Sequence, residues 1–175
     1  MTNAEELVCD ILDLAGTRCS EKPLPCPLNL RATKFPDAAF MSLNQLEWID
    51  LPRFEDARGI LTSLEVVPFE VRNAFFLHSV VSERGGHAHR ATRQLIVPVA
   101  GSFHVHASDG CDSADYALSN SHRALHVPPM HWLRLHDFTA SAVCLVLTDS
   151  SHDDADYLRD WDEFVALSRA ERMAR

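Results

Sequence analysis

Two histidines separated by one residue, His87 and His89, form the part of this sequence best suited to chemistry. Side chains two positions apart project from the same face of an extended strand, so both imidazoles would meet the same ligand. The preceding Gly85 and Gly86 allow positive φ angles and a close backbone approach. Imidazole titrates near neutral pH and is also a common metal ligand, so the pair indicates proton transfer or metal binding. The plainer alternative is that both rings line a half-polar strand face.

The spacing after this pair matches a metal-binding pattern, but the residue types do not. In small jelly-roll barrels of the cupin type, H-x-H is followed after four residues by glutamate and after six more by glycine. This chain has Gln94 and Gly101 at those positions, and Leu133 at the histidine position of the second motif. A neutral amide does not offset the charge of a divalent cation and is a poor donor to transition metals. We therefore expect neither a metal nor a cofactor at this site.

A second pair, His104 and His106, keeps a metal-dependent cupin, for example a dioxygenase, as the alternative. If these rings faced the same cavity as His87 and His89, they would complete a four-histidine site. We expect them instead on an exposed strand face.

Without a metal, two neutral imidazoles suit a reaction that moves protons between neighbouring carbons of a keto sugar. One step removes the proton alpha to the carbonyl, and a later step protonates the adjacent carbon of the enediol. The enediolate oxygen needs a cation or a hydrogen-bond donor, and Arg84 or Gln94 is placed in the sequence to supply one.

Short β-rich runs separated by turn residues surround these side chains. Such a pattern is typical of an all-β sandwich or barrel rather than of alternating helices and strands. Residues 156–167 return to helical spacing, with Leu158, Trp161, Phe164 and Val165 on one stripe. The expected strands are 60–67, 71–80, 94–100, 102–107, 123–128 and 141–148.

The first 45 residues have a different character from the rest. Residues 4–15 have the apolar spacing of an amphipathic helix that ends at Gly16. A proline-rich segment, from Pro23 to Pro36, follows and is incompatible with a helix or a central strand. We therefore predict an N-terminal extension at 1–45 and one β-rich domain at 46–175.

Composition narrows the class of partner. The formal net charge of −9 argues against nucleic-acid binding, which needs a basic footprint. No apolar run reaches the roughly 18–20 residues that span a bilayer, so no membrane partner is expected. The acidic N-terminus and the odd number of cysteines predict a reducing, cytoplasmic location. Local arginines can still bind a small anion; the candidates are Arg58, Arg72, Arg84, Arg93 and Arg134.

Over residues 47–167 the chain resembles the sugar-nucleotide 3,4-ketoisomerases, cupin enzymes that act on dTDP-4-keto-6-deoxyglucose. The most specific segments are R-G-G-H-A-H at 84–89 and D-Y-L-R-D-W-D-E-F at 156–164. Further matching segments in the same order are D-A-R-G-I-L at 56–61, P-F-E-V-R at 68–72, Gln94, G-S-F at 101–103, V-P-P-M-H-W at 127–132 and V-C-L-V-L at 143–147.

The resemblance implies an all-β, cupin-type jelly-roll barrel that acts as a metal-independent homodimer on a dTDP-sugar and supplies a sugar aminotransferase. It implies catalytic roles for His87, His89 and Arg84, and places Arg58 and Arg84 near the sugar and the diphosphate. Arginine suits a diphosphate because its guanidinium contacts phosphate oxygens through paired donors. The other predicted substrate-binding residues are Gln94, Trp132, Arg134, Phe76 and His78.

One departure from the family pattern affects the chemistry. The family usually carries tyrosines in the strand before the R-G-G loop, whereas this chain has Phe75 and Phe76 there. His78 or water would then replace the missing phenol, or the activity would be altered. This leaves a third hypothesis, a non-catalytic module that binds a sugar nucleotide.

Overall fold

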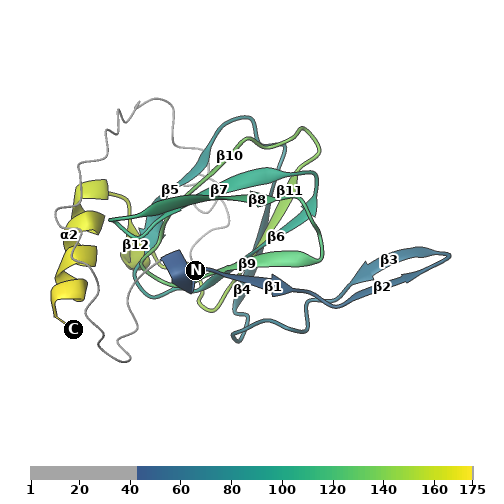
Figure 1. Cartoon of the computed structure of the whole chain (residues 1–175), viewed down its shortest axis with the longest axis horizontal. Coiled ribbons are helices and arrows are strands. Elements are labelled where there is room, and N and C mark those ends of the chain that lie inside the picture. Colours follow the sequence, from purple (N-terminus) through teal and green to yellow (C-terminus); the bar gives the residue numbers. More distant parts are fainter. Residues whose placement is uncertain (1–42, 175) are drawn as a thin grey trace, which may run out of the picture. The chain divides into compact units, whose positions relative to one another are not determined.

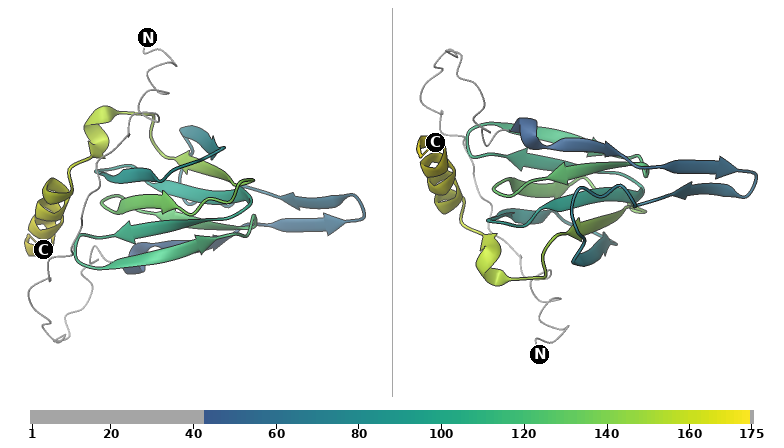
Figure 2. Two further views of the ribbon diagram at one scale, coloured as in Figure 1. Left: turned by 90° about the horizontal axis from the view of Figure 1, so that it is seen from above. Right: turned by 90° about the horizontal axis from the view of Figure 1, so that it is seen from below.

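A computed structural model of the chain describes residues 43–174 (Figures 1 and 2). The helix predicted at 4–15 and the proline-rich segment lie outside the described residues. Two five-stranded antiparallel sheets form the body of the described part. The first sheet has the order β1 (Glu47–Asp50), β9 (Arg123–Val127), β6 (Gln94–Ala100), β11 (Val143–Thr148) and β4 (Asn73–His78). The second has the order β12 (Tyr157–Leu158), β5 (Arg84–His89), β10 (Trp132–His136), β7 (Phe103–Ser108) and β8 (Ser113–Leu118).

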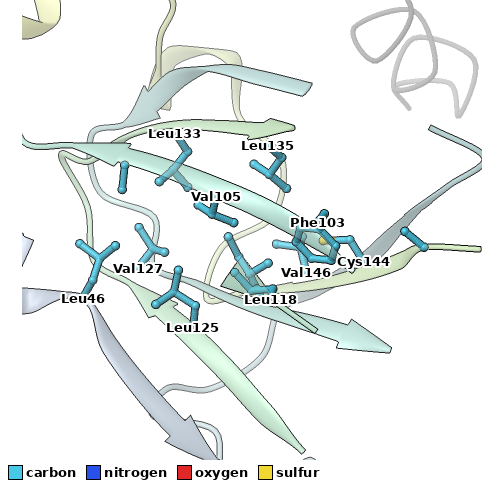
Figure 3. Close-up of a cluster of buried hydrophobic side chains, with 13 residues drawn as sticks. Leu46, Phe103, Val105, Leu118, Leu125, Val127, Leu133, Leu135, Cys144 and Val146 are labelled. Carbon is cyan, nitrogen blue, oxygen red and sulfur yellow. The ribbon is translucent and has the colours of Figure 1, made fainter. Parts of the chain in front are cut away.

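The main core lies between the two sheets (Figure 3), and β7 shows how alternating side chains enter it. On β7, Phe103, Val105 and Ala107 are buried, while the intervening His104 and His106 are only partly buried. Apolar side chains of the first sheet meet this face from the other side, and the most buried among them are Ile96, Leu125, Val127, Cys144 and Val146. Burial of these apolar faces is the main favourable contribution to folding.

This arrangement confirms the predicted all-β jelly roll, in the form of two facing sheets rather than a closed barrel. The runs predicted at 71–80, 94–100, 123–128 and 141–148 each contain an observed strand, and the run at 102–107 overlaps β7. The strand predicted at 60–67 instead ends at Thr62, and residues 63–72 form a loop. The loop buries Phe69 on the outer face of the first sheet, together with Leu95, Val97 and Leu147.

The C-terminal helix, α2 (Trp161–Met173), begins later than the spacing predicted. Asp160 caps it, because its side chain accepts a hydrogen bond from the backbone N–H of Glu163 at 2.8 Å. Residues 157–158 form β12 and pair with β5 instead of continuing the helix. Leu158 and Phe164 still share one apolar cluster, on the outer side of the second sheet. None of the described helices is long and apolar enough to cross a membrane.

A two-stranded hairpin, β2 (Arg53–Asp56) and β3 (Gly59–Thr62), extends beyond the two sheets (Figures 1 and 2). Its large apolar side chains remain in solvent: Phe54, Ile60 and Leu61 are 60%, 57% and 59% exposed. A cluster of exposed apolar side chains on a projecting element is typical of a surface that another chain covers.

Candidate functional site

His87 and His89 lie on β5 and share one face of the second sheet. Their ring centroids are 5.2 Å apart and the rings are nearly perpendicular, at 85°. His87 stands opposite Leu133, a residue of the main core, and His89 stands opposite Tyr157. Both imidazoles therefore face the space between the sheets, at one end of it. Ala88, between them, belongs to the cluster on the outer side.

The two glycines before the pair shape the strand as predicted. Gly85 and Gly86 have φ angles of +87° and +77°, in the region that favours glycine. A Cβ at Gly85 would lie 2.6 Å from the carbonyl oxygen of Leu133, so no other residue fits there without movement. Pairing with β10 is irregular between Leu133 and Arg134, which adds one residue to β5 before the histidines.

A buried carboxylate holds His89 in place. The Nδ1 atom of His89 lies 2.8 Å from Oδ2 of Asp156, and the two side chains are 10% and 12% exposed. Thr92 donates a hydrogen bond to the same oxygen at 2.6 Å, and the backbone N–H of Ala91 donates to Oδ1 at 2.7 Å. Because an ionised carboxylate only accepts hydrogen bonds, Nδ1 of His89 carries the proton and Nε2 remains a proton acceptor.

Electrostatics keep both imidazoles neutral at pH 7. Burial is the main cause that lowers the pKa of His87, and together with the neighbouring His89 it brings this pKa to about 4. Burial also lowers the pKa of His89, although Asp156 acts in the opposite direction. Burial alone would raise the pKa of Asp156, but hydrogen bonds from Thr92 and His89 hold it below its ordinary value. The site thus combines two proton acceptors with one fixed negative charge.

Tyr157 packs against both imidazoles. Its ring centroid lies 4.9 Å from that of His87 and 4.4 Å from that of His89. The phenol oxygen is 3.3 Å from Nδ1 of His152, and the guanidinium of Arg159 lies over the ring at 4.5 Å. The site therefore contains a hydroxyl, although the strand before the R-G-G loop has none.

Sequence reasoning assigned no site role to Asp156, Tyr157 or Thr92. The first two belong to the D-Y-L-R-D-W-D-E-F segment, whose spacing predicts a helix. The structure instead has a two-residue strand at 157–158, which pairs Tyr157 with His89.

Two predicted site residues also face the space between the sheets. Gln94 is buried at the start of β6 and stands opposite Val127, a residue of the main core. Arg84 begins β5 and stands opposite Leu135, which is also in that core.

Four predicted substrate-binding residues lie on the outer faces of the sheets, away from the histidine pair. Trp132 packs against Trp161 and Phe164, with ring centroids 5.3 Å and 5.5 Å away, because α2 covers the outer side of β10. Arg134 stands opposite His106, also on the outer face of the second sheet. Phe76 and His78 lie on the outer face of the first sheet, since Phe75 and Leu77 occupy the core side of β4. The structure does not bring these four beside the histidine pair.

Arg58 also lies away from the pair. It occupies the tip of the β2–β3 hairpin, where its guanidinium pairs with Asp56 and its side chain is 90% exposed.

The four-histidine site considered for a metal does not form within the described residues. His104 and His106 alternate with the buried residues of β7 and so project from the outer face of the second sheet. His87 and His89 face the opposite side of that sheet. A metal held by all four rings is thus ruled out by geometry.

Comparison with known proteins shows the family of the chain. A family model described as FdtA, WxcM-like, C-terminal, matches residues 44–169. The TDP-4-oxo-6-deoxy-alpha-D-glucose-3,4-oxoisomerase of Aneurinibacillus thermoaerophilus is 31% identical to this chain over 121 residues, which cover 66% of this chain and 87% of that relative.

Solved structures show the same fold. The TDP-quinovose 3,4-ketoisomerase WlaRB of Campylobacter jejuni is 27% identical with a TM-score of 0.68, over 71% of this chain and 99% of that one. A mutant of the 3,4-ketoisomerase QdtA of Thermoanaerobacterium thermosaccharolyticum, in complex with TDP-4-keto-6-deoxyglucose, is 24% identical with a TM-score of 0.71, over 74% and 97% of the two chains.

Proposed function

The chain belongs to the FdtA family of WxcM-like C-terminal domains, and from this we propose that it is a sugar-nucleotide 3,4-ketoisomerase. Its substrate is dTDP-4-keto-6-deoxyglucose and its product a dTDP-3-keto-6-deoxyhexose. The observation that carries the proposal is the buried pair His87 and His89 with Asp156 behind it, in a chain whose curated relative bears this activity in its name. No metal or cofactor enters the proposed reaction.

The reaction relocates two protons, one from C3 to C4 and one from O3 to O4, and the site offers two proton acceptors. The carbon-bound proton leaves C3, an enediol forms, and a proton is added to C4. In the same conversion the hydroxyl proton leaves O3, and O4 gains one. Two imidazoles with ring centroids 5.2 Å apart are suited to serve the carbon and the oxygen separately. Both are neutral at pH 7, the state in which each can accept a proton.

The groups around the imidazoles have supporting roles in this proposal. Asp156 acts as a positioning residue, because it fixes the tautomer of His89 and stabilises the imidazolium formed when Nε2 accepts a proton. Arg84 or Gln94 stabilises the enediolate oxygen. Tyr157 provides the phenol that the residues at 75 and 76 lack, and its contact with both imidazoles supports a role in proton exchange.

The direct test is incubation with dTDP-4-keto-6-deoxyglucose in deuterated buffer, followed by NMR of the sugar. We expect deuterium at C3 of recovered substrate and at C4 of a 3-keto product. Tight binding of the nucleotide sugar without exchange or product would overturn the proposal and leave a binding module. The same spectra identify the C4 configuration of the product.

We also propose a homodimer, in which the β2–β3 hairpin of each chain lies against its partner. The exposed Phe54, Ile60 and Leu61 support this, because burial of such a surface favours association. The hairpin would then carry Arg58 toward the partner's site rather than its own. Mass measurement by light scattering tests the dimer, and a monomer at micromolar concentration would contradict it.

We further propose that an aminotransferase consumes the 3-keto product, by replacing the ketone oxygen with an amine. Neither Cys111 nor Cys144, the two described cysteines, forms a disulfide within the described residues, which supports the cytoplasm as the location. We place the start of the catalytic domain near residue 45.

A further inference from the structure

The outer face of the second sheet carries a group of metal-ligand side chains that the proposed reaction does not use. Three imidazoles and two carboxylates gather there from β7, β8, β10 and the residue after β10: His104, His106, Asp115, His136 and Asp137. In the antiparallel register, His104 stands directly opposite His136, and His106 stands directly opposite Asp115. Directly opposed side chains on one face of a sheet are near neighbours.

The polar atoms of this group are close together. The two nitrogens of His136 lie between two carboxylates, with Nε2 3.2 Å from Asp115 Oδ1 and Nδ1 3.0 Å from Asp137 Oδ2. The rings of His104 and His136 are stacked, with centroids 5.5 Å apart and an interplanar angle of 19°. A third imidazole, His106, places Nδ1 3.2 Å from Asp115 Oδ1.

One nitrogen in the group has no hydrogen-bond partner. Nδ1 of His104 is shielded from solvent and unsatisfied. Its nearest carboxylate oxygen, on Asp137, is 3.8 Å away, which is too far for a hydrogen bond. A shielded polar atom without a partner carries a free-energy cost, which a ligand placed between it and Asp137 would remove.

The separations suit a cation. One potential ligand atom from each of His104, His136 and Asp137 lies within 4.8 Å of the others. Tetrahedral zinc with bonds of roughly 2.0–2.1 Å holds its ligand atoms about 3.4 Å apart. Small side-chain rotations therefore bring the three atoms into a coordination sphere. All three side chains are at least partly exposed, so the rotations that form the coordination sphere can also admit an ion from solvent.

We propose that this face binds one divalent cation of the class that prefers imidazole, such as Zn²⁺, through His104, His136 and Asp137. Asp115 accepts a hydrogen bond from the other ring nitrogen of His136 and so orients it, as carboxylates commonly do for metal-bound histidines. The two carboxylates offset the charge of the ion. Arg134 stands opposite His106, so its positive charge lies beside that residue. The proposed cation lies at the other end of the group, where His104 stands opposite His136.

The site is independent of the proposed function. His87 and His89 face the opposite side of the same sheet, so the cation site can exist whether or not the chain is an isomerase. The competing explanation is that the imidazoles only form protonated ion pairs with Asp115 and Asp137. That arrangement predicts no affinity for Zn²⁺ that depends on His104.

Calorimetric titration with Zn²⁺ tests the proposal on the full chain, freed of affinity tag and of metal. Cysteines and the active-site pair can also bind Zn²⁺. The decisive quantity is therefore the difference in Zn²⁺ stoichiometry and affinity between the wild type and each variant. We expect His104→Ala, His136→Ala and Asp137→Asn each to remove one binding event or to weaken it at least about tenfold, since each removes one ligand. His122→Ala, which removes a half-buried imidazole outside the group, should change nothing. The double variant His87→Asn, His89→Asn should keep the event.

Circular dichroism establishes that each variant is folded, and His104→Gln and His136→Gln replace the alanine variants if those fail to fold. Identical Zn²⁺ stoichiometry and affinity in the wild type and in the His104 and His136 variants would overturn the proposal. Loss of the event in the His87 and His89 double variant alone would also overturn it, because the ion would then belong to the inner face.

Discussion

The carboxylate of Asp156 lies 2.8 Å from Nδ1 of His89, although the two residues are 67 positions apart in the chain. The short strand β12 creates this contact, because Tyr157 pairs with His89 across the sheet and places its neighbour Asp156 beside the same ring. A histidine backed by a buried carboxylate accepts a proton at Nε2 more readily than an isolated buried imidazole. The contact with Asp156 therefore suits His89 to act as a base, and not only to line the strand.

Replacing Asp156 with Asn tests the positioning role. The substitution removes the charge that acts to raise the pKa of His89, so this pKa should fall further below its ordinary value. We expect kcat to fall about 10- to 100-fold, within the range of general acid–base effects, and the acidic limb of kcat/KM to move to lower pH. Asp50→Asn, which removes an exposed partner of Arg123, is the control. An unchanged pH profile would contradict the role.

His87→Asn and His89→Asn should each lower kcat by at least about 100-fold, because each removes one of the two proton acceptors. Deuterium exchange at C3 separates their roles. The variant that loses exchange lacks the base for the carbon-bound proton, and the variant that keeps exchange without product lacks the group for the hydroxyl proton. His122→Asn provides a surface control. Wild-type rates in both variants would move the chemistry away from this pair.

Tyr157→Phe keeps the ring between the two imidazoles and removes only the phenol. If the phenol takes part in proton exchange, kcat should fall at least about tenfold with little change in thermal stability. Tyr116→Phe is the matched control, since Tyr116 packs edge-on against Trp48 on the core side, away from the histidines. Full activity of Tyr157→Phe would reduce the role of Tyr157 to packing.

The depressed pKa of His87 predicts the direction in which stability changes with pH. The unfolded chain takes up a proton at this residue near pH 6.5, whereas the folded chain does so only near pH 4. Between these values the unfolded state binds more protons, so the free energy of unfolding should fall as the pH is lowered from 6.5 to 4. His89 acts in the same direction. Urea denaturation across this range measures the slope, which should be shallower in His87→Asn; an equal slope would contradict the assignment.

Mixing two inactive variants tests whether Arg58 serves the partner's site. Arg58→Ala and His89→Asn should each be weakly active or inactive alone. If Arg58 acts across the dimer, a mixed dimer contains one site with both groups intact, and denaturing and refolding the variants together should restore activity. Refolding each variant alone is the control. No recovery, with mixed dimers shown by mass spectrometry, would place Arg58 outside the partner's site.

The sequence alone predicted the all-β fold and the pair of histidines at the centre of the site. Short β-rich runs bounded by turn residues, at 94–100, 102–107 and 141–148, predicted the sheets, because both signals are local. The H-x-H spacing placed His87 and His89 on one face for the same reason. The glycines before them were correctly interpreted, because a positive φ is a local preference of glycine.

Only the tertiary structure decided which distant residues join the pair and which do not. Asp156 and Tyr157 reach the histidines through strand pairing across the chain, whereas Trp132 turns to the outer side because α2 covers it there. Arg58 is carried away on a hairpin, and His104 meets His136 through register alone. Spacing along the chain determines the face on which a side chain projects. What that face meets depends on how the strands pair and on what packs over them, and no local pattern encodes this.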